Sequence, residues 1–432
     1  MRSSHAACWL GCQIFAFLVW RTSGFVPSPP HSSLTPRHTR KWAKVRRTMM
    51  VNPVTEIVAT PTTKTEGRVL DLAIVGGGPA GLALALALKR KGLDVCVYES
   101  VSNIKERGAA VFLQGFGVGA LEDILPGLGE EAIRAGRVVQ YIHLLRPISG
   151  ETIFKLDISR MKELVGYPFI GITRFALQRV LMAHLDKENI ELGCRLKELN
   201  ADGPGGLAEL TFEGKDMPVR AKAVVGADGR RSSVRSKVLE PIKEDTNEML
   251  VWWALSDTAE KPPAPEGEFR MSYGNGGSIY YGEVGENTTM WSLTSFERGG
   301  VDIEADPEVQ KEEALEVITS WPEEVKDVVR NTANSRMIVT NVADSPVQWL
   351  RWSKEPSVTL IGDAAHAMFP SLGMGVTSAL QDVVALASCV GEADESLETA
   401  FKKYEKMRIF PTALVQVFSR VGMWLIENIL CM

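Results

Sequence analysis

Cysteine and histidine are scarce in this chain of 432 residues, which has six of each. Cys8 and Cys12 fall near the N-terminus. The remaining cysteines are scattered without paired spacing, at Cys96, Cys194, Cys389 and Cys431. This distribution indicates neither a disulfide framework nor a zinc site. Beyond residue 55 only three histidines remain, none in a His-Glu-x-x-His arrangement, so we expect no metal site.

Acidic residues are absent from the first 55 positions, which contain eight Lys or Arg. The rest of the chain has 40 basic and 53 acidic residues, a balance of about −13 that argues against nucleic-acid binding. Residues 1–24 have the charged-then-apolar form of a secretory signal, and residues 25–66 contain a transit-like leader and a polar linker. With the junction Ser23-Gly24-Phe25-Val26-Pro27, this segment resembles the bipartite leader of proteins imported into plastids. We predict a plastid (chloroplast) location, with the secretory pathway as the alternative.

A glycine turn between an apolar strand and a helix is the most informative feature of the chain. Leu70–Val75 predict the strand, and Gly76, Gly78 and Gly81 follow it in G-x-G-x-x-G spacing. The first glycine permits a tight turn, the second lets the backbone approach a pyrophosphate, and the third allows close packing of helix on strand.

The helix that follows this turn begins at Pro79 and Ala80 and directs its positive end at the phosphates. Glu99 lies 18 residues after Gly81, at the end of a second predicted strand over Leu93–Tyr98, where a carboxylate accepts hydrogen bonds from ribose hydroxyls. These residues predict dinucleotide binding, but alone they do not separate NAD from FAD.

Two later segments repeat the combination of strand, glycine and carboxylate. Gly226-Ala227-Asp228-Gly229 follows the predicted strand Val219–Val225, and Asp228 is placed to cap the next helix. Gly362-Asp363-Ala364-Ala365-His366 follows another predicted strand, and a further helix begins near Gly375. Three ordered segments of this kind are far more specific than one glycine loop.

The remaining pattern predicts an α/β architecture in which a parallel sheet is interrupted by a second sheet. Short aromatic and β-branched runs separated by glycine turns predict antiparallel strands between residues 241 and 347, and an acidic stretch over Pro307–Asn331 is expected to be helical. The predicted divisions are residues 67–165 and 166–240 for the nucleotide-binding domain, 241–347 for the inserted substrate domain, and 348–432 for the return segment and C-terminal helices.

With these motifs, residues Leu70 to Pro411 resemble the single-component, FAD-dependent class A flavoprotein monooxygenases, the group that includes para-hydroxybenzoate hydroxylase. The resemblance implies a Rossmann-type FAD-binding domain with an inserted antiparallel β-sheet substrate domain and C-terminal helices. It also implies that NADPH or NADH reduces the FAD and that dioxygen then adds to form a flavin C4a-hydroperoxide. The expected reaction is hydroxylation or epoxidation of a small-to-medium apolar or aromatic substrate.

The resemblance also assigns residues to the cofactor. Those expected to bind FAD or line its groove are Gly76, Gly78, Pro79, Ala80, Gly81, Glu99, Arg107, Arg174, Asp228, Gly362, Asp363, Pro370, Gly373, Met374 and Gly375. Two positions depart from the family pattern: Met374 stands where Gln is usual, and Thr377 where Asn is usual. Both departures concern residues expected near the flavin. No catalytic residue is assigned, although His366 is a candidate proton relay, with a structural helix-start histidine as the alternative.

Aromatic residues concentrate on the proposed insert, which would form a roof over the flavin. They are Trp252, Trp253, Tyr273, Tyr280, Tyr281 and Trp291. At adjacent positions only one side chain can face the substrate. The apolar tail Thr412–Cys431 predicts an amphipathic closing helix rather than a membrane span, with peripheral membrane contact as a further interpretation.

Three other functions remain open at this stage. A plastid reductase of the geranylgeranyl reductase type shares the fold and the motif positions. A degenerate FAD-binding protein without turnover is suggested by Met374 and Thr377, and a carotenoid epoxidase would suit the plastid address by analogy alone. A flavin halogenase is disfavoured because the chain lacks a Trp-x-Trp-x-Ile-Pro motif.

Overall fold

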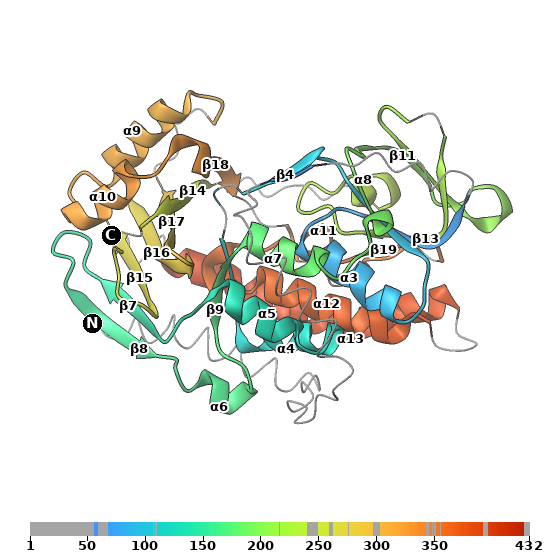
Figure 1. Cartoon of the computed structure of the whole chain (residues 1–432), viewed down its shortest axis with the longest axis horizontal. Helices are drawn as coiled ribbons and strands as arrows, with labels where there is room; N and C mark the ends of the chain where they lie inside the picture. The colour runs from blue at the N-terminus through green and yellow to red at the C-terminus, as the bar shows by residue number, and fades with distance from the viewer. Residues whose placement is uncertain are drawn as a thin grey trace.

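The computed structural model describes residues 56–58, 68–106, 108, 110–215, 217–239, 249–258, 262–274, 276–296, 303–342, 345–347, 349, 351–354, 356–391 and 396–426. The predicted signal, most of the predicted transit segment and the candidate Arg107 lie outside these residues. Figure 1 shows two sheet regions toward opposite ends of the long axis, with the long helices between them.

The first sheet, which we call the motif sheet, has seven strands in the order β10-β3-β2-β13-β12-β11, and β19 also pairs with β13. Its strands are β2 (Val69–Val75), β3 (Val95–Glu99), β10 (Ile190–Leu192), β11 (Leu196–Asn200), β12 (Ala208–Phe212), β13 (Val219–Gly226) and β19 (Val358–Leu360). All pairings are parallel except those of β12 with β11 and β13. A parallel pair needs a crossover, and α3 (Pro79–Arg90) provides it between β2 and β3. The predicted strand, turn, helix and strand are therefore confirmed.

Helices cover the motif sheet and carry its core. The longest are α12 (Gly375–Cys389) and α13 (Leu397–Leu425), and α12 packs against α3, α4 and α13. The others in this part of the chain are α4 (Gly115–Ile124), α5 (Leu128–Ala135), α6 (Met161–Val165), α7 (Arg174–Met182), α8 (Ser233–Val238) and α11 (Asp363–His366). Because α3 is buried from Gly81 to Leu88, its apolar residues surround the helix instead of forming one stripe.

The second sheet, which we call the roof sheet, has the order β18-β14-β17-β16-β15-β7-β8. Its strands are β7 (Tyr141–Leu145), β8 (Thr152–Asp157), β14 (Met249–Asp257), β15 (Glu268–Gly274), β16 (Gly277–Gly285), β17 (Thr288–Ser295) and β18 (Met337–Val342). Neighbours are antiparallel except β15 and β7, which run parallel. The hairpins predicted in the insert are present. The sheet also takes up β7 and β8 from the segment before it, and these two strands cover the edge that β15 would otherwise expose.

The two faces of the roof sheet bury different clusters. One face, with Ile279 and Leu293, packs against α9 (Pro307–Val317) and α10 (Glu323–Arg330). The other face, with Phe269 and Met271, packs toward the motif sheet. The acidic stretch expected to be helical forms two helices because Pro322 begins a new one.

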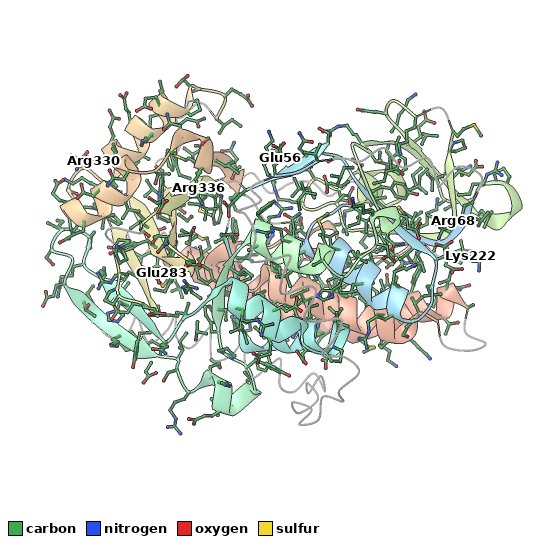
Figure 2. All side chains as sticks on the ribbon, in the orientation of Figure 1. Glu56, Arg68, Lys222, Glu283, Arg330 and Arg336 are labelled. Carbon is green, nitrogen blue, oxygen red and sulfur yellow. The ribbon has the colours of Figure 1, made fainter. Side chains whose placement is uncertain are left out.

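Small elements and ion pairs connect the two sheets. A three-stranded sheet joins β5 (Ala110–Leu113), β9 (Ile170–Thr173) and β6 (Arg137–Val138), and β1 (Glu56–Val58), within the predicted linker, pairs with β4 (Asn103–Lys105). Arg137 Nε lies 3.9 Å from Glu283 Oε2 on β16, and Arg336 Nη2 lies 3.4 Å from Glu106 Oε2. Figure 2 labels Glu283 and Arg336 in the roof-sheet half of the molecule. These ion pairs join the roof-sheet region to the three-stranded sheet and to the residue after β4.

Candidate functional site

The three glycine segments meet at one edge of the motif sheet. β13 lies between β2 and β19, and Gly226 is in register with Val75 on one side and Leu360 on the other. All three strands are parallel, so the segments that follow them leave the sheet at the same edge. Ligands of open α/β sheets bind outside the carboxyl ends of the strands. The topology therefore brings together motifs that lie up to 286 positions apart, from Gly76 to Gly362.

Two glycines of the first turn leave no space for a side chain. Gly76 has φ +112°, and a Cβ there would lie 2.6 Å from the Ala227 carbonyl carbon. A Cβ at Gly81 would collide with the Gly76 carbonyl oxygen, which lies against the start of α3. These contacts fit the predicted roles of a tight turn and a close helix approach.

The N-terminus of α3 is open to an anion. Its N-cap is Gly78, which has no side chain to cap the first turn, and no acidic residue lies in that turn. Pro79 occupies the first helical position and Ala80 the second, so the free N–H groups and the helix dipole favour a phosphate here. A Cβ at Gly78 would lie 3.6 Å from Arg174 Nη2, which places this guanidinium beside the same turn.

Glu99 and Gln178 hold the other side of the turn. Gly77 N donates to Glu99 Oε2 at 2.6 Å, while Val101 N donates to Glu99 Oε1 at 3.0 Å. Gln178 Nε2 donates to Gly77 O at 2.8 Å. Gln178 was not predicted. Its position one helical turn after Arg174 was the signal that could have identified it.

The Asp228 carboxylate is occupied by the start of α8. It accepts hydrogen bonds from Ser233 N at 2.7 Å, Val234 N at 3.1 Å and the Ser232 hydroxyl at 2.5 Å. Asp228 therefore satisfies N–H groups in the first turn of α8 as expected, although the N-cap residue is Ser232, whose hydroxyl accepts from Arg235 N at 2.9 Å. Burial raises the pKa of Asp228 above its ordinary value.

The third glycine segment, from Gly362, leads to a second helix start without a side-chain cap, that of α12. Asp363 is exposed at the start of α11, and a Cβ at Gly375 would lie 4.0 Å from Asp363 Oδ1. Gly362 and Gly373 have φ of +59° and +61°, and exposed Pro370 lies in the loop between them. No side chain caps α12 and no acidic residue lies in its first turn, so this N-terminus also favours negative charge.

The two departures from the family pattern have structural partners. Met374 is buried with Leu372 and Val415 in a small apolar cluster beneath α13. Thr377 is fully buried, and its hydroxyl accepts a hydrogen bond from Gln114 N at 3.3 Å. Both side chains therefore contact protein at this helix start.

His366 belongs to a buried charged cluster centred on Asp382. His366 Nε2 lies 2.5 Å from Asp382 Oδ2, which also accepts from Gly362 N at 2.9 Å, and Arg408 Nε donates to Asp382 Oδ1 at 2.8 Å. Burial alone would raise the pKa of Asp382, but the neighbouring His366 and Arg408 charges outweigh it and hold that pKa below its ordinary value. His366 and Asp382 are both 0% exposed, and Asp382 links the histidine to the turn at Gly362. The role of His366 as a proton relay stays a prediction.

Asp382 and Arg408 are site residues that sequence reasoning missed. They lie on α12 and α13, and only the packing of these helices brings them to the turn at Gly362. An acid on a buried helix face was the available signal, because a buried charge requires a partner.

Aromatic side chains close the space between the third segment and the roof sheet. A Cβ at Gly373 would lie 3.7 Å from Phe112 Cβ. The Phe112 ring in turn meets the ring of Phe269 on β15 edge-on, with 4.5 Å between the ring centroids. Phe169 stacks on Phe112 at 5.8 Å. The lining between the loop and this sheet is therefore apolar.

The roof sheet divides the predicted aromatics between its faces. Trp252 and Trp291 are fully buried on the α9 and α10 side, where their indole N–H groups donate to Gln310 O and Thr332 Oγ1, each at 2.8 Å. Tyr281 lies on this face too. Tyr273 and Tyr280 meet edge-on at 5.7 Å on the face toward the motif sheet.

Among the described residues there is no group of three or more His, Cys, Asp or Glu placed to hold a metal ion. No helix in the described part of the chain is both long enough and apolar enough to span a bilayer.

Sequence comparisons agree with this geometry. A family model described as FAD binding domain matches residues 69–409. Aurachin C monooxygenase/isomerase of Stigmatella aurantiaca is 30% identical over 343 residues, which cover 79% of this chain and 85% of that protein. The chloroplastic zeaxanthin epoxidase of Capsicum annuum is 30% identical over 372 residues, 83% of this chain but 54% of the epoxidase. The chain therefore spans about half the length of that second relative.

Structure comparison gives the same fold. HpxO of Klebsiella pneumoniae, solved with FAD and uric acid, superposes with a TM-score of 0.75 at 21% identity, covering 84% of this chain and 90% of that one. This likeness supports the expected combination of a Rossmann-type domain with an inserted sheet.

Proposed function

Because this chain belongs to the FAD-binding-domain family and is an FAD-dependent monooxygenase of the class A type, we propose that it oxygenates an apolar or aromatic small molecule with electrons from NADPH or NADH. The observation that carries the proposal is the convergence of the glycine segments after β2, β13 and β19 with two open helix starts. A lone glycine turn would support only nucleotide binding.

The residues present fit FAD. The turn at Gly76 and the start of α3 would hold the pyrophosphate, with Arg174 beside it and Glu99 at the adenosine ribose. Exposed Asp363 would bind the ribityl chain, and the flavin ring would lie against the loop that ends at Gly375. When bound, FAD supplies electron storage and the activation of dioxygen.

The protein's own contribution is orientation, electrostatics and exclusion of water. The start of α12 directs its positive end toward the predicted flavin position, which favours negative charge on the ring. Phe112 and Phe269 provide an apolar wall next to that position and limit the entry of water. Asp382 holds Gly362 N and thereby fixes the turn from which Asp363 projects.

The substrate class follows from this lining. Phe112, Phe169 and Phe269 present aromatic surface, and Tyr280 adds a ring on the same face of the roof sheet. We therefore propose an apolar or aromatic substrate that is hydroxylated or epoxidised. The relatives named above are a monooxygenase/isomerase and an epoxidase, names that favour oxygenation over the reductase alternative.

We also propose that the protein works in a plastid. The acid-free leader supports this location by its composition, and the Capsicum annuum relative is described as chloroplastic. A fluorescent fusion of the full chain is expected to enter plastids, whereas a fusion that lacks residues 1–55 is expected to stay outside. Secretion of the full-length fusion would favour the alternative.

Stopped-flow absorbance of the FAD-loaded protein tests the proposed reaction. We expect NADPH or NADH to bleach the flavin, and oxygenated buffer to restore its colour with consumption of dioxygen. Nicotinamide oxidation that is independent of oxygen would favour the reductase alternative. Bound flavin that neither nicotinamide bleaches, even with a panel of aromatic compounds, would favour a degenerate FAD-binding protein.

A further inference from the structure

Helix α13 carries an apolar stripe on its solvent side. The stripe repeats at alternating intervals of three and four residues and consists of Met407, Phe410, Leu414, Val417, Val421 and Trp424. Residues with this spacing lie on one face of a helix. The Phe410 side chain is 62% exposed and that of Trp424 57% exposed. The stripe residues between these two, Leu414, Val417 and Val421, are each at least partly accessible to solvent. A large apolar surface of this kind marks an interaction site.

The opposite face of α13 explains why the stripe cannot turn inward. Gln416 Nε2 donates to Ala367 O at 2.9 Å, and Ser419 Oγ donates to Phe369 O at 2.5 Å. Arg408 reaches Asp382 from the same side. The helix therefore buries a polar face that is satisfied by the loop next to the predicted flavin site, and this leaves the apolar stripe outside.

The charge along this segment is of one sign. Between Lys406 and Ile426 there is no Asp or Glu, and Lys406 is exposed next to the stripe. Arg420 lies 14 positions, about four turns, further along the helix and donates to Ser345 O at 3.1 Å. If two copies paired through the stripe, residues 406–426 of one copy would offer no carboxylate to the cations of the other. Anionic headgroups, by contrast, complement both cations.

We propose that α13 docks on an anionic lipid surface, with the stripe from Met407 to Trp424 in the interface. The helix lies along the membrane plane, since no described helix can span a bilayer. Phe410 and Trp424 anchor the two ends of the stripe at the headgroup level. Because the buried face of α13 holds residues 367–371, docking brings the predicted flavin loop close to the lipid surface.

Vesicle sedimentation of the full-length, FAD-loaded protein tests this inference and requires no turnover. Vesicles of phosphatidylcholine with phosphatidylglycerol are compared with vesicles of phosphatidylcholine alone. The variant is Phe410→Gln with Val421→Gln, and the matched control is Leu164→Gln, which changes another exposed apolar residue, 72% accessible, on α6. All three proteins carry the same leader, so their differences report the substituted surface. Retained FAD shows that each is folded.

We expect the double variant to bind the anionic vesicles at least about tenfold more weakly than the unsubstituted protein and the Leu164→Gln control. Lys406→Glu is expected to weaken binding to anionic vesicles only, and added salt should do the same. Equal sedimentation of all variants would overturn the proposal. So would a double variant that keeps its lipid binding but changes from dimer to monomer in light scattering, because the stripe would then be a contact between copies. Failure of flavin reduction would leave these results unaffected.

Discussion

The motif sheet and the roof sheet have seven strands each but use them differently. In the motif sheet the predicted cofactor positions lie beyond the strand ends, in the turns at Gly76 and Gly362. In the roof sheet they lie along the strands, where successive residues face opposite sides. Tyr280 and Tyr281 are neighbours, yet one faces the motif sheet and the other faces α9 and α10.

This difference has a consequence for mutation. Substitutions in the turns of the motif sheet meet backbone atoms and rigid charge clusters, so they should affect cofactor binding and folding together. Substitutions in the roof sheet should separate these effects according to face.

Asp382→Asn removes the buried negative charge that contacts Gly362 N, His366 and Arg408 in the motif-sheet half. Breaking a buried pair of this kind costs about 3–5 kcal/mol, because His366 and Arg408 lose their partner. We expect denaturant unfolding to show that loss, together with weaker retention of FAD. Asp363→Asn is the matched control: Asp363 is exposed, so FAD affinity should fall while stability changes by less than about 0.5 kcal/mol. Similar stability of both variants would contradict the bracing role of Asp382.

Gly76→Ala tests the first turn. The added Cβ would overlap the backbone of Ala227 at a φ of +112°, so we expect a loss of about 3 kcal/mol or more and no bound FAD. Gly92→Ala provides the comparison, since Gly92 also has a positive φ of +83° but no atom within 4 Å of its added Cβ. Its cost should be about 1 kcal/mol with normal flavin content. Flavin content and urea unfolding of the two variants decide the point.

Trp252→Phe and Trp253→Phe compare the two faces of β14. Trp252 is fully buried and donates to Gln310 O, so its loss should lower the unfolding free energy by about 2 kcal/mol without changing KM for the substrate. Trp253 lies on the opposite face, where its N–H donates to Thr340 Oγ1 at 3.2 Å. Its replacement should change KM more than stability. An altered KM in Trp252→Phe alone would mean that the faces are assigned the wrong way round.

The pH dependence of stability gives the finest test of the cluster. Since the pKa of Asp382 is lowered on folding, the unfolded chain binds its proton first as pH falls. Its contribution is therefore complete above the ordinary Asp pKa of about 4 and is lost as pH drops through the lower folded value. The unsubstituted protein should lose stability below about pH 4 more steeply than Asp382→Asn. Parallel curves for the two proteins would exclude this contribution.

Much of the candidate site was predictable because its signals are local. A glycine at a tight turn, an acid at a strand end and an uncapped helix start each depend on a few neighbouring residues, so the spacing from Gly76 to Gly81 and the residue Glu99 could be interpreted directly. The roof strands were also predictable, because alternation and glycine turns are local patterns too.

The sequence by itself indicated the strands, turns and helices next to the three glycine segments and the hairpins of the insert, and it predicted that the three segments serve one nucleotide. Only the tertiary structure decided that Asp382 and Arg408 support Gly362, that β7 and β8 complete the roof sheet, and that Tyr281 faces away from the predicted site. The physical reason is the separation along the sequence of the residues that interact. Backbone conformation depends on near neighbours, whereas register, the choice of sheet face and the pairing of buried charges depend on segments that meet only when the chain packs.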